Sequence, residues 1–306
     1  MAITAFAPTI GAGAPSGDTR RGGRTALLLL LPGIAYLALF FLAPLVSLIL
    51  TSLQTPRLYG DIGQYDYAFR IENYADVVGE YLPQILRSFG YALVATAIAL
   101  VISYPLAYFI GVALRRYPLA QSLLLVLVIA PFFISFLLRT LAWKQLLSND
   151  SLVVQGLQAL SLLGPGEYFI GSPAAVIFGL VYNFVPFMVL PLYASLERLD
   201  IRYLEAGSDL YAGAFTTFRT VTLPLSMPGI VSGTLLTFIP AAGDYVNASR
   251  DFLGSPDTSM LGNAVEANFL VLQNFPAAAA LSIILMAAIL VLVAVYVRRS
   301  GTDELL

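Results

Sequence analysis

Few residues of this chain could do chemistry within its long apolar segments, and Asp244 is the foremost of them. It lies in the stretch PAAGDYVN, near the end of an apolar run. An ionisable group in a membrane-spanning segment is costly and is by default a candidate for function. Its carboxylate could pair with the ammonium group of a cationic solute, or with Arg139 of another apolar segment as a gate. The alternative is an interfacial carboxylate that is solvated or caps a helix end.

Several aromatic and amide side chains could also contact such a cationic solute. Trp143, Tyr182 and Tyr245 could stack on a protonated amine through cation–π contacts worth about 0.5–2 kcal/mol each, and Asn183 could hydrogen-bond the same amine. Aromatic residues also anchor helices at membrane interfaces, and amides commonly join neighbouring helices. The sequence leaves both interpretations open.

The residue types that are missing exclude several kinds of site. The chain has no Cys and no His, which removes disulfides, the usual zinc and haem ligands, and Cys or His catalytic centres. No metal site is expected. The sequence lacks the G-x-x-x-x-G-K-[ST] loop that cradles ATP phosphates. We therefore expect a non-catalytic chain without a cofactor of its own, in which any ATP is bound by another subunit.

Composition predicts a membrane protein. Of the 306 residues, 58 % are hydrophobic and 11 % are charged, whereas soluble domains carry about 25 % charged residues. The apolar faces must therefore meet lipid. Charges cluster between long apolar runs, which is typical of a polytopic all-α membrane protein. The net charge of −2 gives no indication of nucleic-acid binding.

Six segments are apolar enough to span a bilayer, for which about 20 residues suffice. They are 26–53, 86–114, 119–147, 173–194, 228–247 and 277–297. Together they define a transmembrane domain over 26–299. Residues 1–25 are typical of a disordered cytoplasmic tail, and 300–306 form a second short tail. The first apolar run is too long for the h-region of a cleaved signal peptide.

The basic residues predict that both termini are cytoplasmic. With the N-terminus inside, every short inner segment carries a basic pair or cluster, such as Arg115–Arg116 and Arg298–Arg299. The outer segments are acidic by contrast. This asymmetry follows from the positive-inside rule, or from a vestibule that attracts a cation.

The inner loop 195–227 is much longer than the 2–8 residues usual between helices. Apolar positions recur in it at three- and four-residue steps, with one larger gap, from Leu196 to Tyr211, which favours short amphipathic helices. Gly213 can end a helix through a left-handed cap, and Pro224 breaks the chain before the next span. Such a pair of short helices could enter a groove on a soluble protein, or lie on the inner headgroups.

This loop resembles the Glu-Ala-Ala loop of permease subunits of bacterial ABC importers. The family pattern is Glu-Ala-Ala, three residues, Gly, nine residues, an aliphatic residue, any residue, then Leu-Pro. The matching positions are Glu205, Ala206, Val221, Leu223 and Pro224. Gly207 replaces the second Ala, and Tyr211 stands where Gly is expected. Gly213 is then expected to supply the turn.

Further stretches resemble permeases of spermidine/putrescine ABC importers, above all the first permease of that pair, the PotB type. They are 130–147, 178–200, 222–247 and 252–270, within a resemblance that covers about 26–299. The resemblance implies the type I ABC importer permease fold, with six transmembrane helices in the inner membrane. Iron, phosphonate, opine or sulfur-oxyanion importers are the alternative in the same class. An uncoupled carrier or channel is a second alternative.

The resemblance also implies the partners of the chain. It would form half of a pore with a second permease as a heterodimer, driven by two ATPases that bind ATP and Mg, and supplied with polyamine by an extracytoplasmic substrate-binding protein. Motion of the inner loop would rock the spans and give alternating access. The residues expected to couple to the ATPases are Glu205, Ala206, Gly207, Asp209, Tyr211, Gly213, Leu223 and Pro224.

Overall fold

The computed structural model describes residues 22–57, 61–161, 164 and 168–299. The predicted tails lie outside these residues, apart from 22–25. The α-helices are α1 (Gly22–Leu37), α2 (Ala43–Ser52), α3 (Glu72–Gly111), α4 (Pro118–Ile129), α5 (Phe136–Leu146), α6 (Leu152–Ala159), α7 (Pro173–Glu197), α8 (Ile201–Asp209), α9 (Ala214–Thr217), α10 (Leu223–Leu225), α11 (Met227–Ala242), α12 (Leu261–Glu266) and α13 (Phe275–Arg299).

Shorter segments complete the described secondary structure. The 3-10 segments are η2 (Ala113–Arg116), η3 (Ala130–Phe133) and η5 (Pro256–Thr258), and the π-helical segments are η1 (Ala38–Leu42), η4 (Phe218–Thr222) and η6 (Ala267–Val271). Strands β1 (Thr55–Pro56) and β2 (Tyr65–Asp66) pair antiparallel as a small hairpin.

The chain divides into two compact units, residues 1–48 and 49–306. The helical run Leu29–Ser52 is apolar enough to cross a membrane, and none of its most apolar stretch is buried by the chain itself. Because a helix that is apolar all round cannot face water, this run requires lipid or another protein around it.

The described residues contain four helices that could each span a membrane, or up to six spans when each of two bent helix pairs counts as one. The predicted all-α polytopic architecture is confirmed. The third predicted span, 119–147, is not straight, since its two helical halves meet at 94°. The fifth, 228–247, is helical as α11 only to Ala242, so Asp244 lies in the following loop.

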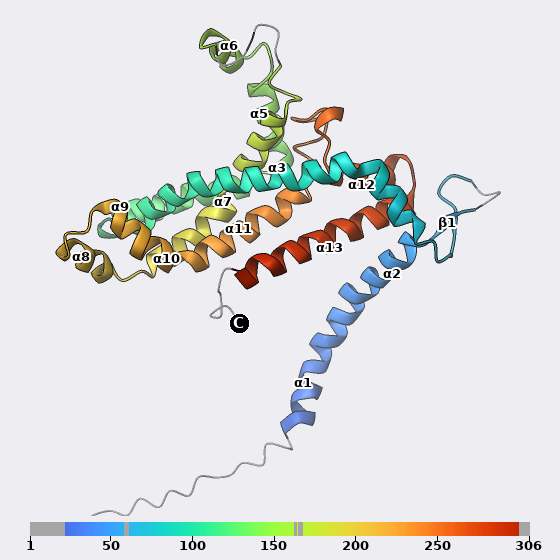
Figure 1. Ribbon diagram of the computed structural model, residues 1–306, viewed down its shortest axis with the longest axis horizontal. Helices are drawn as coiled ribbons and strands as arrows, with labels where there is room; N and C mark the ends of the chain where they lie inside the picture. Colours follow the sequence, from blue (N-terminus) through green and yellow to red (C-terminus); the bar gives the residue numbers. More distant parts are fainter. Residues whose placement is uncertain (1–21, 58–60, 162–163, 165–167, 300–306) are drawn as a thin grey trace, which may run out of the picture. The chain divides into compact units, whose positions relative to one another are not determined.

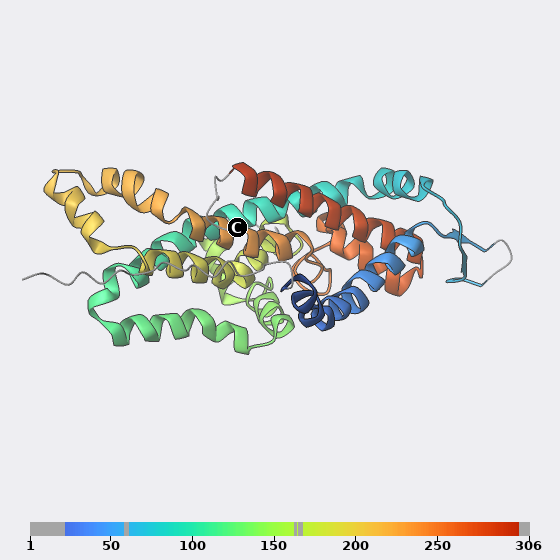
Figure 2. The ribbon, with the colours of Figure 1, turned by 90° about the horizontal axis from the view of Figure 1, so that it is seen from below.

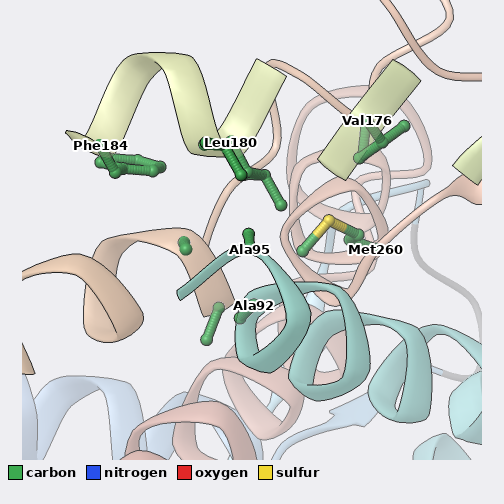
Figure 3. Packing of buried hydrophobic residues seen from close by; sticks show 10 residues of the cluster. Ala92, Ala95, Val176, Leu180, Phe184 and Met260 are labelled. Carbon is green, nitrogen blue, oxygen red and sulfur yellow. The ribbon is translucent and has the colours of Figure 1, made fainter. Parts of the chain in front are cut away.

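In the second unit α3, α7, α11 and α13 lie side by side, with α8 and α9 at one end of them (Figures 1 and 2). The helix α3 is 40 residues long and is kinked at Tyr81, whose φ and ψ are −106° and 15°. The core between α3 and α7 brings Ala92 and Ala95 against Leu180 and Phe184 (Figure 3). Small side chains on one helix let the other approach closely.

The packing of α11 on α7 depends on Gly229 and Gly233. A Cβ at Gly229 would lie 2.6 Å from the Cβ of Ser195 and 2.8 Å from the carbonyl oxygen of Pro191, and one at Gly233 would lie 2.8 Å from the Sδ of Met188. Two glycines four residues apart form the small-xxx-small contact of membrane helices. Larger side chains at either position would push the two helices apart.

Candidate functional site

A buried polar cluster joins α5, α7 and the loop after α11. Its members Thr140, Asn183, Asn247 and Asp244 are all buried. The Nδ2 of Asn183 lies 3.2 Å from Thr140 Oγ1, 3.1 Å from Asn247 Oδ1 and 3.1 Å from the carbonyl oxygen of Gly179. The Oδ1 of Asn183 is buried and has no partner among the described residues. It is therefore an acceptor that an incoming donor could use.

Asp244 closes the turn at the start of this loop. Its Oδ2 accepts from the backbone N–H of Asn247 at 2.8 Å, and its Oδ1 accepts from Asn247 Nδ2 at 3.1 Å. Aspartate commonly fixes turns in this way. The ion pairs recorded within the described ranges do not include one between Asp244 and Arg139. The gate pair considered from the sequence is thus not formed in this conformation.

Arg139 on α5 is a buried cation whose hydrogen bonds are incomplete. Only 8 % of the residue is exposed, and its Nε and Nη1 have no acceptor within the described part of the chain. The guanidinium lies 5.8 Å from the ring centroid of Phe136, one turn earlier. Buried N–H groups without an acceptor are costly, so packing alone does not account for an arginine here.

The predicted aromatic residues separate into two places. Trp143 of α5 meets Phe178 and Tyr182 of α7 edge-on, with ring centroids 4.7 and 5.1 Å apart. Tyr245 does not join them. It is half-exposed and lines a cavity of about 690 Å³ together with Glu266 and residues of α13. Partial burial raises the pKa of Glu266. The ring contacts place Trp143 beside Tyr182, whereas Tyr245 lines the separate cavity.

The sequence did not indicate three residues at this site, namely the cluster members Thr140 and Asn247 and the glycine Gly179, whose carbonyl accepts from Asn183. Asn247 follows Asp244 by three residues, a spacing at which a carboxylate reaches the backbone N–H. Gly179 lies one turn before Asn183, and a Cβ there would lie 2.5 Å from Asn247 Oδ1. Local spacing could have indicated Asn247, whereas Thr140 and Gly179 join the cluster only through packing between helices.

The inner loop forms a helix pair, α8 and α9, that we call the docking element (residues 201–217). Figure 1 shows it at the end of the helices α3, α7 and α11. Its tip is exposed and apolar, since Leu210 and Phe215 are exposed and Tyr211 is 98 % exposed. Glu205 and Asp209 on α8 are exposed as well. Exposed apolar side chains ringed by charge are typical of a protein-binding surface.

The turn after α8 is made by Tyr211 and not by Gly213. Tyr211 has a φ of 57°, in the left-handed region, and the N–H of Ala212 donates to the carbonyl of Gly207 at 3.0 Å. This bond is the helix-ending contact of a left-handed cap. Gly213 has a φ of −63° and a ψ of 157° and precedes α9. The expectation that Gly213 supplies the left-handed turn is wrong.

The absence of a side chain at Gly207 allows close packing within the docking element. A Cβ at Gly207 would lie 3.1 Å from Thr217 Oγ1 and 3.2 Å from Thr217 Cγ2, which is tighter than an ordinary contact. The glycine lets α8 approach α9. Leu223 and Pro224 begin α10 at the other end of the loop.

Comparison with known proteins identifies the family. Residues 104–300, which include the polar cluster and the docking element, match the family described as binding-protein-dependent transport system inner membrane component. The chain belongs to this family. As an inner membrane component with several candidate spans, it is a multi-pass inner-membrane protein.

Relatives of this inner membrane component are permease subunits. It is 37 % identical over 237 residues to the spermidine/putrescine transport system permease protein PotB of Haemophilus influenzae, covering 77 % of this chain and 81 % of that protein. It is 35 % identical over 268 residues to PotB of Escherichia coli, covering 87 % and 94 % of the two chains. The resemblance to permeases of the PotB type is confirmed.

A solved structure shares the fold of this inner membrane component. It belongs to a bacterial alginate ABC transporter in complex with an alginate pentasaccharide-bound periplasmic protein. The alignment covers 93 % of this chain and 96 % of the matched transporter chain, with a TM-score of 0.66. The two chains are 17 % identical, so the likeness concerns the fold. The predicted ABC importer permease fold is thereby confirmed.

Proposed function

We propose that this chain is the permease subunit of an ATP-binding cassette importer for spermidine and putrescine, and forms half of its translocation pore. The observation that carries the proposal is the 35–37 % identity to permease proteins of spermidine/putrescine transport systems. A second permease completes the pore as a heterodimer, and an extracytoplasmic binding protein delivers the solute. The N- and C-termini are cytoplasmic in this arrangement.

The docking element is the proposed entry point for the energy of ATP. Two ATPase subunits bind ATP and Mg, and each permease inserts its inner loop into a groove on one of them. The exposed tip at Leu210 and Tyr211 supports this role, because apolar side chains at the turn between two short helices can enter a groove on a soluble protein. The permease itself is non-catalytic. Closure of the ATPases moves α8 and α9 and tilts the attached spans.

The polar cluster is the proposed lining of the solute path. The free Oδ1 of Asn183 can accept a hydrogen bond from an ammonium group, which is all donor and no acceptor. Trp143 and Tyr182 are carried by α5 and α7, the helices that also carry Thr140 and Asn183, and supply aromatic edges and faces. Asp244 keeps the adjoining loop in place through Asn247.

The test is reconstitution of the whole assembly in proteoliposomes with its receptor. Spermidine and putrescine are expected to stimulate ATP hydrolysis and to accumulate inside the vesicles in an ATP-dependent manner. Ferric iron, a phosphonate, an opine and a sulfur oxyanion serve as competing solutes. If one of these stimulates hydrolysis and the polyamines do not, the substrate assignment is overturned. Uptake without any ATPase would overturn the importer class.

The docking role is tested separately with Glu205→Ala. Glu205 is exposed on α8, so its removal leaves the permease folded. We expect weaker co-purification of the ATPases and lower uptake. Asp61→Ala, which removes an exposed acid from the loop at the hairpin, is the matched control and should leave co-purification unchanged. Intact co-purification and uptake in Glu205→Ala would remove Glu205 from the docking contact.

A further inference from the structure

Arg115, in the 3-10 segment η2 that follows α3, reaches across to the junction between α7 and the docking element. Its Nη1 donates to the carbonyl of Leu199 at 2.8 Å and its Nη2 to the carbonyl of Leu196 at 2.9 Å. Its Nη2 also donates to the carbonyl of Glu197. Its Nε donates to the carbonyl of Gly111, the last residue of α3, at 3.0 Å. One guanidinium thus holds carbonyl groups of two different helices.

Two of these acceptors, the carbonyls of Leu196 and Glu197, lie in the last turn of α7. The carbonyl of Leu196 also accepts from the backbone N–H groups of Arg198 and, at 3.3 Å, of Leu199. The last carbonyls of a helix have no intrahelical donor, and they form the negative end of the helix dipole, which favours a cation. A planar guanidinium has five N–H donors in a fixed fork and can reach several of them at once, whereas an ammonium has three donors on a single atom. Arg115 therefore adds side-chain donors to the backbone hydrogen bonds at the end of α7.

The two helix ends are also in direct contact. A Cβ at Gly111 would lie 3.4 Å from the backbone nitrogen of Glu197 and 3.5 Å from the Cβ of Leu196, so α3 and α7 abut at this point. Only Asp200 separates Leu199, whose carbonyl Arg115 holds, from the first residue of α8. The path from α8 through Leu199 and Arg115 to α3 therefore contains no long loop.

The far end of the inner loop is tied to the same helix. Tyr104 of α3 shares a buried hydrogen bond with Ser226, with 2.8 Å between the two hydroxyl oxygens. Its ring meets Phe218 edge-on at 5.4 Å. The helix α3 thus anchors the inner loop at both ends, through Arg115 where the loop leaves α7 and through Tyr104 where it enters α11.

We propose that Arg115 is a positioning residue that transmits movement of the docking element to α3, in addition to the covalent path through α7. The inference rests on the proposed function, since it needs ATPases that move the docking element. Under this proposal, the docking element moves α3 directly when the spans rock. Loss of the guanidinium would let α8 move while α3 lags, so that ATP is hydrolysed with less transport.

The experiment compares Arg115→Ala and Arg115→Lys with Arg116→Ala in the reconstituted assembly. Arg116 is the neighbouring arginine, is exposed, and has no side-chain hydrogen bond or ion pair recorded in the described ranges. We expect Arg115→Ala to lower spermidine uptake per ATP hydrolysed by about 3- to 30-fold, with KM for the loaded receptor unchanged. Arg115→Lys should recover part of the ratio, and Arg116→Ala should match the wild type.

A second measurement does not depend on transport. Trypsin cleaves after Arg198 and Arg202, which are exposed on either side of the held carbonyl of Leu199. Cleavage there is expected to accelerate in Arg115→Ala and to stay unchanged in Arg116→Ala. If Arg115→Ala does not assemble, the assembled Arg115→Lys protein gives the uptake ratio.

The outcomes separate the inference from the function on which it rests. Wild-type uptake per ATP in assembled Arg115 variants, or unchanged cleavage at Arg198 and Arg202, overturns the role of Arg115 and leaves the importer intact. A wild-type assembly that polyamines do not stimulate overturns the proposed substrate instead. Accelerated cleavage would then still report that Arg115 holds the junction.

Discussion

Asn183 on α7 donates from its side-chain amide to Oδ1 of Asn247, which lies 3.1 Å away in the loop after α11. The contact is possible because Gly179, one turn earlier on α7, presents no side chain toward the same oxygen. Asn247 in turn holds Asp244 with two hydrogen bonds. A single close approach between a helix and a loop thus supports the whole buried polar cluster.

Gly179→Ala should disrupt this approach. The added Cβ would lie 2.5 Å from Asn247 Oδ1 and 2.6 Å from Leu253 Cδ1. Overpacking of this kind costs about 1–3 kcal/mol of the free energy of unfolding. We expect the melting temperature of the purified assembly to fall by about 3–10 °C.

The matched control is Gly90→Ala on α3. A Cβ at Gly90 meets nothing within 4 Å, and alanine is the better helix former. Gly90→Ala should therefore melt at the wild-type temperature or slightly above it. Equal melting temperatures for the Gly179 and Gly90 variants would show that the loop relaxes away from α7 at no cost.

Asn183→Leu removes the amide and keeps a side chain of similar size. Hydrogen bonds between membrane helices are worth about 0.6 kcal/mol on average and up to about 1.7 kcal/mol. Because Asn247 Oδ1 would remain buried without this donor, we expect a loss of about 1–3 kcal/mol. The loss is measured as a lower melting temperature of the assembly.

Thr237→Val on α11 is the control for burial of a polar group. The Oγ1 of Thr237 is buried and has no partner in the described part of the structure, so its removal should be neutral or stabilising. If Asn183→Leu is as stable as Thr237→Val, the amide contributes nothing to the packing of α7.

The sequence predicted the polytopic helical fold because long apolar runs and basic clusters are local signals. It also delimited the loop 195–227 and named Asp244, Asn183 and Arg139 as candidates for function. It did not predict the partners of Asn183, since Thr140 and Asn247 lie 43 and 64 residues away from it along the chain. Such contacts depend on how α5 and α7 pack, which no local pattern encodes.

Two further local signals in the sequence indicate features that the structure shows. The Gly-x-x-x-Gly pair at Gly229 and Gly233 indicates a close helix contact, and the structure places it against α7. The family position occupied by Tyr211 indicated a left-handed residue there, whatever its type. Gly213 was preferred because glycine adopts positive φ most easily, yet the turn geometry is set by the position at which α8 ends.

Asp244→Asn tests whether this carboxylate binds the solute or holds the turn. Both oxygens are taken by Asn247, and an amide cannot accept at both positions. We expect a lower melting temperature and a lower maximal rate of uptake in proteoliposomes. KM for spermidine should stay within about twofold, because no binding group has been removed.

Asp257→Asn, in the same loop, is the control, since Asp257 is exposed and its loss should change neither quantity. A large rise in KM for Asp244→Asn at an unchanged melting temperature would make Asp244 a solute ligand. That result would restore the role first considered from the sequence.

Tyr211→Asn should stabilise the docking element, because asparagine tolerates the left-handed conformation that costs most other residues about 1–2 kcal/mol. The φ of 57° at Tyr211 is retained in this variant, and no buried contact is lost since the side chain is 98 % exposed. Amide hydrogen exchange at Leu210 and Ala212, whose N–H groups close the end of α8, should slow by about 2- to 5-fold. Tyr203→Asn, within α8, is the matched control and should accelerate exchange, because asparagine is a weak helix former. Faster exchange in both variants would mean that the tyrosine ring, and not the backbone, stabilises this turn.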